Sequence, residues 1–281
     1  MFFCLKKLLF LLKDLYFILR KNNRLYYFGI FPDWFAAEIE SKKFGNSYQS
    51  DYILDKIAKS TELVRKHQAC YEQDGVAFFE ENNNYPLLSA FFYILADTNK
   101  LNVTDFGGSL GSTYFRYHHL LNKFPIKWNI VEQAHFVEYG KKNIPEIDFY
   151  YDSSAVKDSN TLLLSSVMMY ISNIYDILEK TLQHKFDYII VDETAFTKDD
   201  TDQIRLQHVP ESIYSAIYPL RLFSLTNFKS FFCNHNYKLV YEWNYFERGG
   251  EGISIIDGFK RIPTKEKGFL FKYDSSTMKN K

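Results

Sequence analysis

The chain has 281 residues, of which 46% are hydrophobic and 24% charged, and its formal net charge is zero. This composition allows a sizeable core in one large domain, or in one domain with a substantial extension, and it excludes global disorder. No chain-wide positive field attracts nucleic acid and no basic motif with interleaved aromatic residues occurs, so we expect no nucleic-acid partner.

Residues 1–24 predict a basic amphipathic helix. Lys6, Lys13 and Arg20 are seven residues apart and fall on one stripe, while leucine, isoleucine and phenylalanine cover the remaining surface. No uncharged run approaches the ~20 apolar residues that a membrane-spanning helix needs. Two interpretations stay open. Residues 1–20 lie on the anionic inner face of the cytoplasmic membrane as a peripheral contact, or the helix docks on the protein's own core or on a partner.

Residues 25–99 predict a mainly helical portion. The segment Tyr52–Cys70 places apolar residues at helical spacing with charges between them. Pro86 starts a second helix, Leu87–Ala96, which is nearly all apolar and therefore buried. The polar stretch Asp97–Asn102 marks the boundary to the next domain.

Residues 100–273 alternate between short strands and helices, and a polar tail, 274–281, follows. The expected strands are Asn102–Phe106, Lys127–Val131, Asp148–Tyr151, Thr161–Ser165 and Tyr188–Asp192, separated by helices Ser112–Lys123, Ala134–Asn143 and Ile174–His184. Such alternation predicts an α/β fold with a mostly parallel, doubly wound, Rossmann-like sheet. The late strands Tyr237–Trp243 and Gly268–Tyr273 have no clear helix between them, which favours an antiparallel pair at the sheet edge.

A glycine-rich turn follows the first of these strands. The strand ends at Asp105-Phe106, and Gly107, Gly108 and Gly111 come directly before the next helix. Glycine permits a tight turn and a close approach of backbone to ligand, and the helix then points its N-terminal amides at a negative group. A plain turn is the alternative for this motif alone.

Two further residues support a nucleotide-type site because of their order along the chain. Glu132 ends the second strand, where an acidic residue accepts hydrogen bonds from ribose hydroxyls in nucleotide-binding α/β folds. Ser165 ends the fourth strand, where a small side chain can admit a flat adenosyl group. Tight packing of strand against helix is the alternative explanation for this serine.

The ordered set DFGGSLG, IVEQAHFVEYG, LLLSSVMMYI, YIIVDETAF and LQHVPESIY resembles a family of S-adenosylmethionine-dependent methyltransferases encoded largely in bacterial surface-polysaccharide and lipopolysaccharide gene clusters. The similarity extends upstream to about Tyr27. It implies a class I methyltransferase fold with S-adenosylmethionine as cofactor. It also implies that Asp105, Gly107, Gly108 and Gly111 line the methionine end of the cofactor and that Glu132 binds its ribose. One departure is that Ser109 and Leu110 separate the second and third glycines.

Candidate acceptor-binding residues follow the fifth strand. Asp192 lies at its carboxyl end, where α/β folds gather reactive groups. After a polar, mobile-looking stretch, the segment Ile204–Pro219 is dense in hydrogen-bonding side chains, which predicts one wall of a pocket for a polar acceptor, a small molecule or glycan. We assign acceptor binding to three of these residues. They are Arg205, Gln207 and Tyr214.

Transfer of a methyl group to an acceptor oxygen or nitrogen requires a proton to leave. Histidine titrates near neutral pH, and of the seven histidines only His208 lies in this segment. We therefore predict His208 as general base, with Asp192 orienting it or the acceptor. A loop-stabilising role for His208 is the alternative.

Two other functions remain open. A nicotinamide-dependent oxidoreductase uses a similar sheet, but its G-x-G-x-x-G pattern needs a glycine where Phe106 stands. A non-catalytic scaffold with this fold is the second. No metal site is predicted, since adjacent histidines such as His118 and His119 point about 100° apart on a helix. The odd, widely spaced cysteines Cys4, Cys70 and Cys233 fit free thiols in a reducing cytoplasm.

Overall fold

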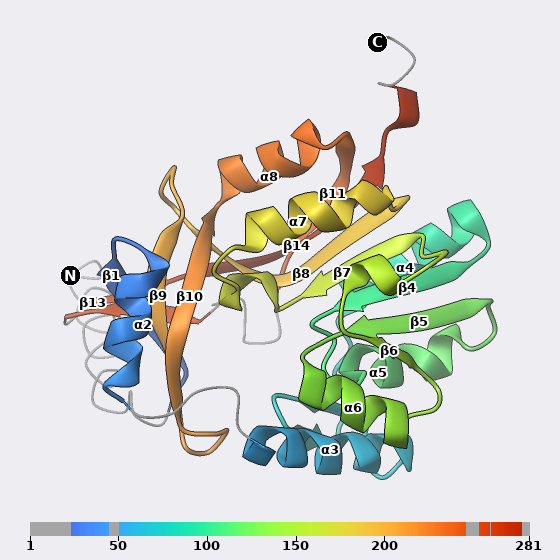
Figure 1. Cartoon of the computed structure of the whole chain (residues 1–281), viewed down its shortest axis with the longest axis horizontal. Coiled ribbons are helices and arrows are strands. Elements are labelled where there is room, and N and C mark those ends of the chain that lie inside the picture. The colour runs from blue at the N-terminus through green and yellow to red at the C-terminus, as the bar shows by residue number, and fades with distance from the viewer. Residues whose placement is uncertain (1–23, 45–50, 246–252, 259, 277–281) are drawn as a thin grey trace, which may run out of the picture.

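The computed structural model describes residues 24–44, 51–245, 253–258 and 260–276 (Figure 1). Its helices are α2 (Trp34–Lys42), α3 (Asp51–Arg65), α4 (Tyr85–Thr98), α5 (Ser112–Leu121), α6 (Ala134–Asn143), α7 (Ile174–Thr181) and α8 (Leu225–Asn234), with short 3-10 turns η2 (Ser153–Ala155), η3 (Met168–Tyr170) and η4 (Leu182–His184). Its strands are β1 (Tyr26–Phe31), β2 (Tyr71–Gln73), β3 (Val76–Phe78), β4 (Leu101–Phe106), β5 (Ile126–Val131), β6 (Asp148–Tyr150), β7 (Thr161–Ser165), β8 (Tyr188–Thr197), β9 (Gln203–Val209), β10 (Ala216–Ser224), β11 (Tyr237–Asn244), β12 (Ser254–Asp257), β13 (Lys260–Pro263) and β14 (Lys265–Tyr273).

The predicted parallel sheet is confirmed. Strands β6, β5, β4, β7 and β8 lie side by side in this order, and each neighbouring pair is parallel. Strand β14 is antiparallel to β8, and β11 is antiparallel to β14, so the two late strands form the expected antiparallel pair. This is a mostly parallel, Rossmann-like sheet with antiparallel late strands, in agreement with the fold class that the sequence predicts.

Helices cover both faces of this sheet (Figure 1). Along β7, Leu163 packs in a core with residues of α4, α5 and α6, whereas its neighbours Leu162 and Leu164 pack in a second core with residues of α7 and α8. Successive side chains of a strand point to opposite faces, so a run of leucines fills both cores. The central strand β7 and the first residues of β8 therefore read as apolar runs, whereas β4 and β5 include polar residues.

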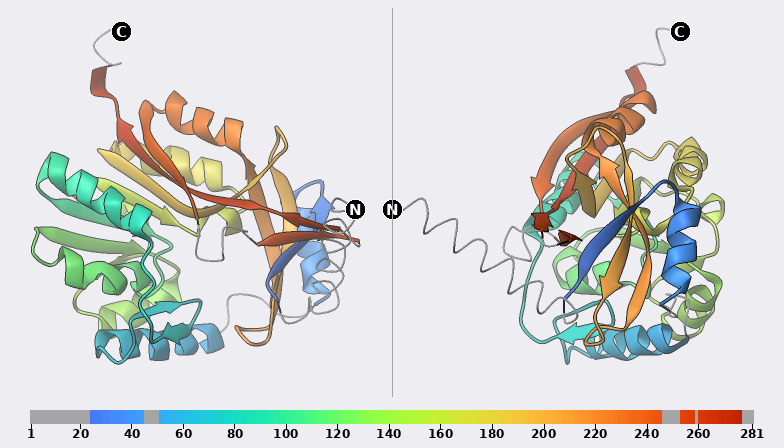
Figure 2. Two further views of the ribbon diagram at one scale, coloured as in Figure 1. Left: turned by 180° about the vertical axis from the view of Figure 1, so that it is seen from behind. Right: turned by 90° about the vertical axis from the view of Figure 1, so that its left-hand side faces the viewer.

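A second group of strands extends the sheet beyond β8. Phe223 and Ser224 of β10 pair in parallel with Phe196 and Thr197 at the end of β8, and β9, β1, β12 and β13 follow in that order. Figure 2 shows this group, which we call the sheet extension (β10, β9, β1, β12 and β13), beside the parallel sheet. Most of the segment Ile204–Pro219, which the sequence predicts as one wall of the acceptor pocket, forms β9 and the start of β10. The polar side chains on these strands do not prevent pairing, since only one face of each strand needs to be apolar.

The N-terminal portion contains the predicted helices and also strands that the sequence pattern did not indicate. The helix expected after Pro86 is α4, and Asn84 caps it by accepting a hydrogen bond from the backbone N–H of Leu87 at 3.1 Å. Strand β1 pairs with β9 and β12, which lie far away in sequence. Strands β2 and β3 form a separate hairpin.

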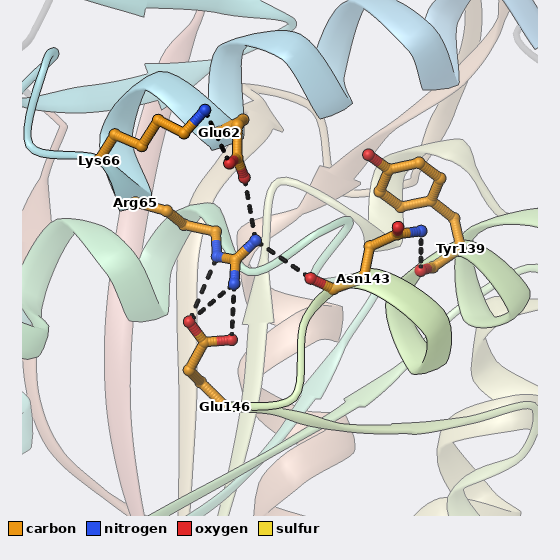
Figure 3. Close-up of polar contacts among 6 residues, drawn as sticks. All are labelled: Glu62, Arg65, Lys66, Tyr139, Asn143 and Glu146. Carbon is orange, nitrogen blue, oxygen red and sulfur yellow. Dashed lines mark hydrogen bonds and ion pairs between the residues drawn. The ribbon is translucent and has the colours of Figure 1, made fainter.

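Arg65 ties helix α3 to the end of α6 and to the segment between α6 and β6 (Figure 3). Its guanidinium donates to both carboxylate oxygens of Glu146, at 2.8 and 3.0 Å, and to the carbonyl oxygen of Asn143 at 3.1 Å. It also bonds Glu62 of its own helix at 2.9 Å. A bidentate arginine–carboxylate pair fixes orientation, and it therefore sets the position of α3 and of the β2–β3 hairpin beside it.

The basic amphipathic helix predicted for residues 1–24 lies outside the described residues except for Arg24 and stays a prediction. Over the ranges that the structure describes, no helix combines the length and the apolar character that a membrane crossing needs. The predicted polar tail is described as far as Ser276.

Candidate functional site

A cavity of about 1620 Å³ opens at the carboxyl ends of β4, β5, β7 and β8. Ligands of open α/β sheets bind at this edge. The volume exceeds the roughly 300–1,000 Å³ of a pocket for one small molecule, so it offers room for two. We distinguish two parts of its lining: the glycine-loop half, around Asp105–Ser109, Glu132 and Ser165, and the tyrosine half, around Tyr170, Gln207, Tyr214 and Tyr218.

Backbone conformation or lack of space requires glycine at all three positions of the loop. Gly107 and Gly111 have φ of +74° and +94°, a backbone conformation that residues with a side chain rarely adopt. A Cβ on Gly108 would lie 2.5–2.8 Å from the carboxylate atoms of Asp105, which sits under the loop. Gly107 and Gly108 line the cavity, but Gly111 does not. Gly111 instead begins α5 and packs so tightly that a Cβ would lie 2.4 Å from Ile147.

Asp105 is a buried carboxyl group at the floor of this loop. It is 1% exposed, and the indole N–H of Trp128 donates to its Oδ2 at 3.0 Å. Burial raises its pKa to about 7, the hydrogen bond from Trp128 partly offsets this, and the charge of Glu132 adds to the rise. The group is therefore poised between its charged and neutral forms near physiological pH.

Glu132 lines the cavity at the end of β5, as the sequence predicts for a ribose ligand. The backbone N–H of Gln133 donates to its Oε1 at 3.0 Å, and the N–H of Ser109 bonds the same carboxylate. Burial raises the pKa of Glu132, and these two hydrogen bonds lower it again. Next to it, the hydroxyl of Ser109 is buried with no hydrogen-bond partner among the described residues. A polar ligand would supply one.

Three non-glycine residues around the cavity hold a left-handed backbone conformation. Ser109, Ser166 and Glu193 have φ of +54°, +51° and +48°, and all three line the cavity. Such conformations cost on the order of 1–3 kcal/mol each and persist where the surroundings enforce them, commonly at functional sites. Ser165, predicted at the adenosyl position, also lines the cavity, beside Ser166.

Asp192 is fully buried and does not line the cavity. Its Oδ2 accepts from the side-chain amide of Asn84 at 2.8 Å, and its Oδ1 accepts from the indole of Trp243 at 2.9 Å. The structure therefore gives Asp192 a positioning role, linking β8 to the start of α4 and to β11. Its predicted role of orienting His208 or the acceptor stays a prediction.

The neighbouring Glu193 does face the cavity, because a bulge in β8 turns the chain there. In the pairing of β8 with β14, Asp192 and Glu193 together stand opposite the single residue Gly268. Gly268 has no room for a side chain, since a Cβ would lie 2.0 Å from the ring of Trp243. The indole that fills this space is the one that bonds Asp192, so burial of Trp243 and the orientation of Glu193 depend on each other.

Phenol and amide groups form a connected wall in the tyrosine half. The hydroxyl of Tyr170 donates to Gln207 Oε1 at 2.9 Å, and Gln207 Nε2 donates to the hydroxyl of Tyr218 at 3.1 Å. The hydroxyls of Tyr214 and Tyr218 are 3.2 Å apart. Burial raises the pKa of Tyr218 well above its ordinary value, and Tyr170, Tyr214 and Asp74 raise it further. The Tyr218 phenol is therefore a neutral hydrogen-bonding group, and the predicted residues Gln207 and Tyr214 lie together here.

His208 and Arg205 do not line the cavity. His208 projects from the opposite face of β9 from Gln207, because side chains alternate along a strand. Its Nδ1 lies 3.1 Å from the carbonyl oxygen of Arg24, and its ring stacks on Tyr26 at 4.6 Å. Arg205 is buried and donates to the carbonyl oxygen of Gly29 at 2.8 Å. The structure therefore does not bring His208 or Arg205 to the cavity, and their roles as general base and acceptor ligand stay predictions.

Sequence reasoning missed Glu72, which the β2–β3 hairpin brings to the glycine-loop half. It is 5% exposed, and it accepts hydrogen bonds from the backbone N–H of Gly75 at 2.7 Å and from the hydroxyl of Ser112. Burial raises its pKa to about 7 despite these bonds. No local motif marks Glu72, since its place at the start of α5 depends on how the hairpin packs.

Carboxylates dominate the charged lining of the cavity. Among the described residues that line it, eight are acidic, and they are Glu38, Glu72, Asp74, Asp105, Glu132, Asp152, Glu193 and Glu266. Three are lysine or arginine, namely Lys42, Arg116 and Lys180. Burial raises the pKa of Glu72 and Asp105 to about 7, but the other six acidic residues still outnumber the three cations. This surplus favours ligands with positive charge and disfavours those with phosphate groups.

Comparison with known proteins gives fold-level likeness only. No protein-family model matches the chain, and no curated protein matches it. Among solved structures, LepI in complex with S-adenosylmethionine is similar at 12% identity and a TM-score of 0.46, over 69% of this chain and 49% of LepI. The chain thus spans about half the length of LepI.

Two smaller structures are similar at the same level. An S-adenosylmethionine-dependent methyltransferase from Clostridium acetobutylicum is 9% identical with a TM-score of 0.44, over 79% of this chain and 99% of that one. The glycopeptide N-methyltransferase MtfA bound to sinefungin is 10% identical with a TM-score of 0.46, over 66% of this chain and 86% of that one. At such identities and scores, function has to be argued from the cavity itself.

Proposed function

We propose that this chain is an S-adenosylmethionine-dependent methyltransferase. The observation that carries the proposal is an acid-rich cavity at the carboxyl edge of a Rossmann-like sheet, with a glycine loop on one strand and Glu132 on the next. The cofactor has a sulfonium and an ammonium group and no phosphate. Its two positive groups outnumber its single carboxylate, which suits a lining with more carboxylates than cations.

The same charge balance speaks against a nicotinamide cofactor. A dinucleotide carries a pyrophosphate, which needs backbone amides and cations around it. Here Asp105 and Glu132 lie at the glycine loop, where a pyrophosphate would have to approach. Position 106 is also phenylalanine rather than the first glycine of the dinucleotide pattern.

The residues of the glycine-loop half fit the proposed cofactor. Glu132 accepts hydrogen bonds from ribose hydroxyls, the unpartnered hydroxyl of Ser109 gains a polar partner, and the backbone of Gly107 and Gly108 permits close approach. When bound, the cofactor supplies an electrophilic methyl group on its sulfonium. The protein's tasks are to align the acceptor, exclude water and remove a proton.

We propose that the acceptor is a polar molecule, such as the sugar of a bacterial surface glycan. The resemblance of the sequence to methyltransferases of surface-polysaccharide gene clusters suggests this class, and it implies a cytoplasmic enzyme. The tyrosine half supports a polar acceptor, because its hydrogen-bonding wall of Gln207 and tyrosines faces the same cavity.

Calorimetry with S-adenosylmethionine, S-adenosylhomocysteine and NAD tests the cofactor assignment. We expect both sulfur compounds to bind in the micromolar range and NAD to bind at least tenfold more weakly. Binding of NAD by folded protein that binds neither sulfur compound would overturn the proposal. Binding of S-adenosylhomocysteine without methyl transfer to any acceptor would instead favour a non-catalytic scaffold.

We further propose that residues 1–20 attach the protein peripherally to the inner face of the cytoplasmic membrane. Their basic stripe and apolar remainder suit an anionic bilayer, and attraction through basic residues weakens as salt screens the field. Cosedimentation with anionic vesicles should fall sharply when residues 1–20 are deleted and when salt is raised. Equal sedimentation of both proteins would reject this attachment.

A further inference from the structure

We propose that the acceptor is an amine, an amino sugar rather than a neutral or phosphorylated sugar, and that Glu193 binds its ammonium form beside the tyrosine wall. This inference rests on the proposed methyltransferase function and specifies its substrate class. It is carried by the placement of Glu193, by the chemistry of the tyrosine half and by the elements that supply the cavity's cations.

Glu193 lies between the two halves of the cavity. In the sheet, β8 separates β7, which ends in Ser165 of the glycine-loop half, from β10, which carries Tyr218 of the tyrosine half. Ser165 pairs with Asp192, the residue before Glu193. A group held by Glu193 is therefore at the border between a ligand in the glycine-loop half and a ligand in the tyrosine half, where methyl transfer has to occur.

The backbone of Glu193 is strained in this position. The residue has φ of +48° and lies at the bulge opposite Gly268, where Trp243 packs over Gly268 and donates a hydrogen bond to the neighbouring Asp192. A regular strand would avoid the strain. Bulges are common next to active sites, where they change the direction of a side chain, and we infer this role for the bulge at Glu193.

The tyrosine half suits a positive group. Asp74 is close enough to Tyr218 to raise the pKa of its phenol, and Glu266 lines the cavity from β14. The cations of the described lining come from α2, α5 and α7, and none comes from β1, β8, β9, β10 or β14. Carboxylates form strong charge-assisted hydrogen bonds with ammonium groups, and the faces of tyrosine rings attract them. Lys56 of α3 donates to the carbonyl oxygen of Ile213 but does not line the cavity, so a phosphate in this half would meet carboxylates without a lining cation from these strands.

Methyl transfer to the acceptor nitrogen takes two steps, loss of a proton and attack on the methyl carbon. The acceptor arrives as an ammonium ion, and its nitrogen loses one proton through the Glu193 carboxylate to bulk water. The free lone pair of the nitrogen then forms a bond to the methyl carbon, while the carbon–sulfur bond breaks with its electron pair left on sulfur. The positive charge moves from sulfur to the methylated nitrogen, which stays beside Glu193 until release.

The test compares three sugars that differ in one group: glucosamine, glucose and glucose 1-phosphate. Their binding to full-length protein saturated with S-adenosylhomocysteine is measured by calorimetry, and again without it. We expect glucosamine to bind at least tenfold more tightly than glucose, and glucose 1-phosphate to bind most weakly. With S-adenosylmethionine, mass spectrometry should find the added methyl group on nitrogen.

Variants separate the role of Glu193 from an effect on folding. Glu193→Gln should weaken glucosamine binding about tenfold and leave glucose binding unchanged, whereas Glu211→Gln, an exposed glutamate outside the cavity lining, should change neither. Equal affinity for all three sugars, tighter binding of the phosphate, or an unchanged glucosamine affinity in folded Glu193→Gln would overturn the amine assignment. Failure of S-adenosylhomocysteine to bind, with glucosamine still preferred, would overturn the methyltransferase proposal alone.

Discussion

The two halves of the cavity differ in how directly the sequence reveals them. In the glycine-loop half, the predicted residues Asp105, Gly107, Gly108, Glu132 and Ser165 all line the cavity. In the tyrosine half, Gln207 and Tyr214 line it, whereas Asp192, Arg205 and His208 do not. The first half is built from strand ends, so position along the chain predicts position in space. The second is built from strand faces and a bulge, where neighbours in sequence point in opposite directions.

The largest expected effect comes from Gly108→Val in the glycine-loop half. A Cβ there would lie 2.5–2.8 Å from the Asp105 carboxylate, so the loop has to move and the cavity wall moves with it. We expect affinity for S-adenosylhomocysteine to fall at least about 100-fold, roughly 3 kcal/mol, in calorimetry. The control is Gly258→Asn, because a Cβ there meets no atom within 4 Å and asparagine tolerates the φ of +56° at this position. Similar affinity losses in both variants would mean that the loop is not the binding site.

Glu132→Ala sharpens the comparison by removing a side chain and leaving the backbone intact. Loss of charge-assisted hydrogen bonds to a ribose should weaken binding of S-adenosylhomocysteine by roughly 1–3 kcal/mol. The matched control is Glu138→Ala, an exposed glutamate on the following helix, α6, which should bind as the wild type does. An unchanged affinity in Glu132→Ala would show that the strand end does not hold the ribose.

Glu72→Gln tests whether the acidity of the glycine-loop half affects stability. The folded protein keeps a proton on Glu72 up to about pH 7, whereas the unfolded chain loses it near pH 4.5. The free energy of unfolding of the wild type therefore falls as pH rises from about 4.5 to about 7. The free energy of unfolding of Glu72→Gln should fall less over the same range. The difference between them should change by on the order of 2–3 kcal/mol across this window in urea unfolding.

The control for this titration is Glu211→Gln, whose exposed side chain should leave the pH dependence of unfolding as it is in the wild type. Asp105 titrates in the same range in every variant and cancels from the comparison. A constant difference in the free energy of unfolding between wild type and Glu72→Gln at all pH values would contradict a raised pKa of Glu72.

The smallest expected effect is that of His208→Gln in the sheet extension. Because His208 stacks on Tyr26 and bonds the backbone of Arg24, its removal should change stability by about 1 kcal/mol and methyl transfer by less than about threefold. Turnover and affinity for S-adenosylhomocysteine should be measured together. A loss of turnover of about 100-fold with unchanged affinity would restore His208 as the general base.

The sequence by itself determined the parallel sheet, its antiparallel late strands and the glycine-loop half. Each of these depends on local patterns: apolar runs of strand length, glycines at a strand end and an acidic residue at the end of the next strand. Because the carboxyl ends of parallel strands meet at one edge, the order of motifs in the chain places their side chains in one site.

Tertiary structure alone decided the sheet extension and the composition of the tyrosine half. Strand β1 pairs with β9 about 180 residues later, and the β2–β3 hairpin brings Glu72 to α5, which no local pattern indicates. The face that each residue of β9 presents depends on pairing, so Gln207 enters the cavity and His208 does not. At the bulge in β8 opposite Gly268, Glu193 lines the cavity and the neighbouring Asp192 does not, which depends on how β8 pairs with β14.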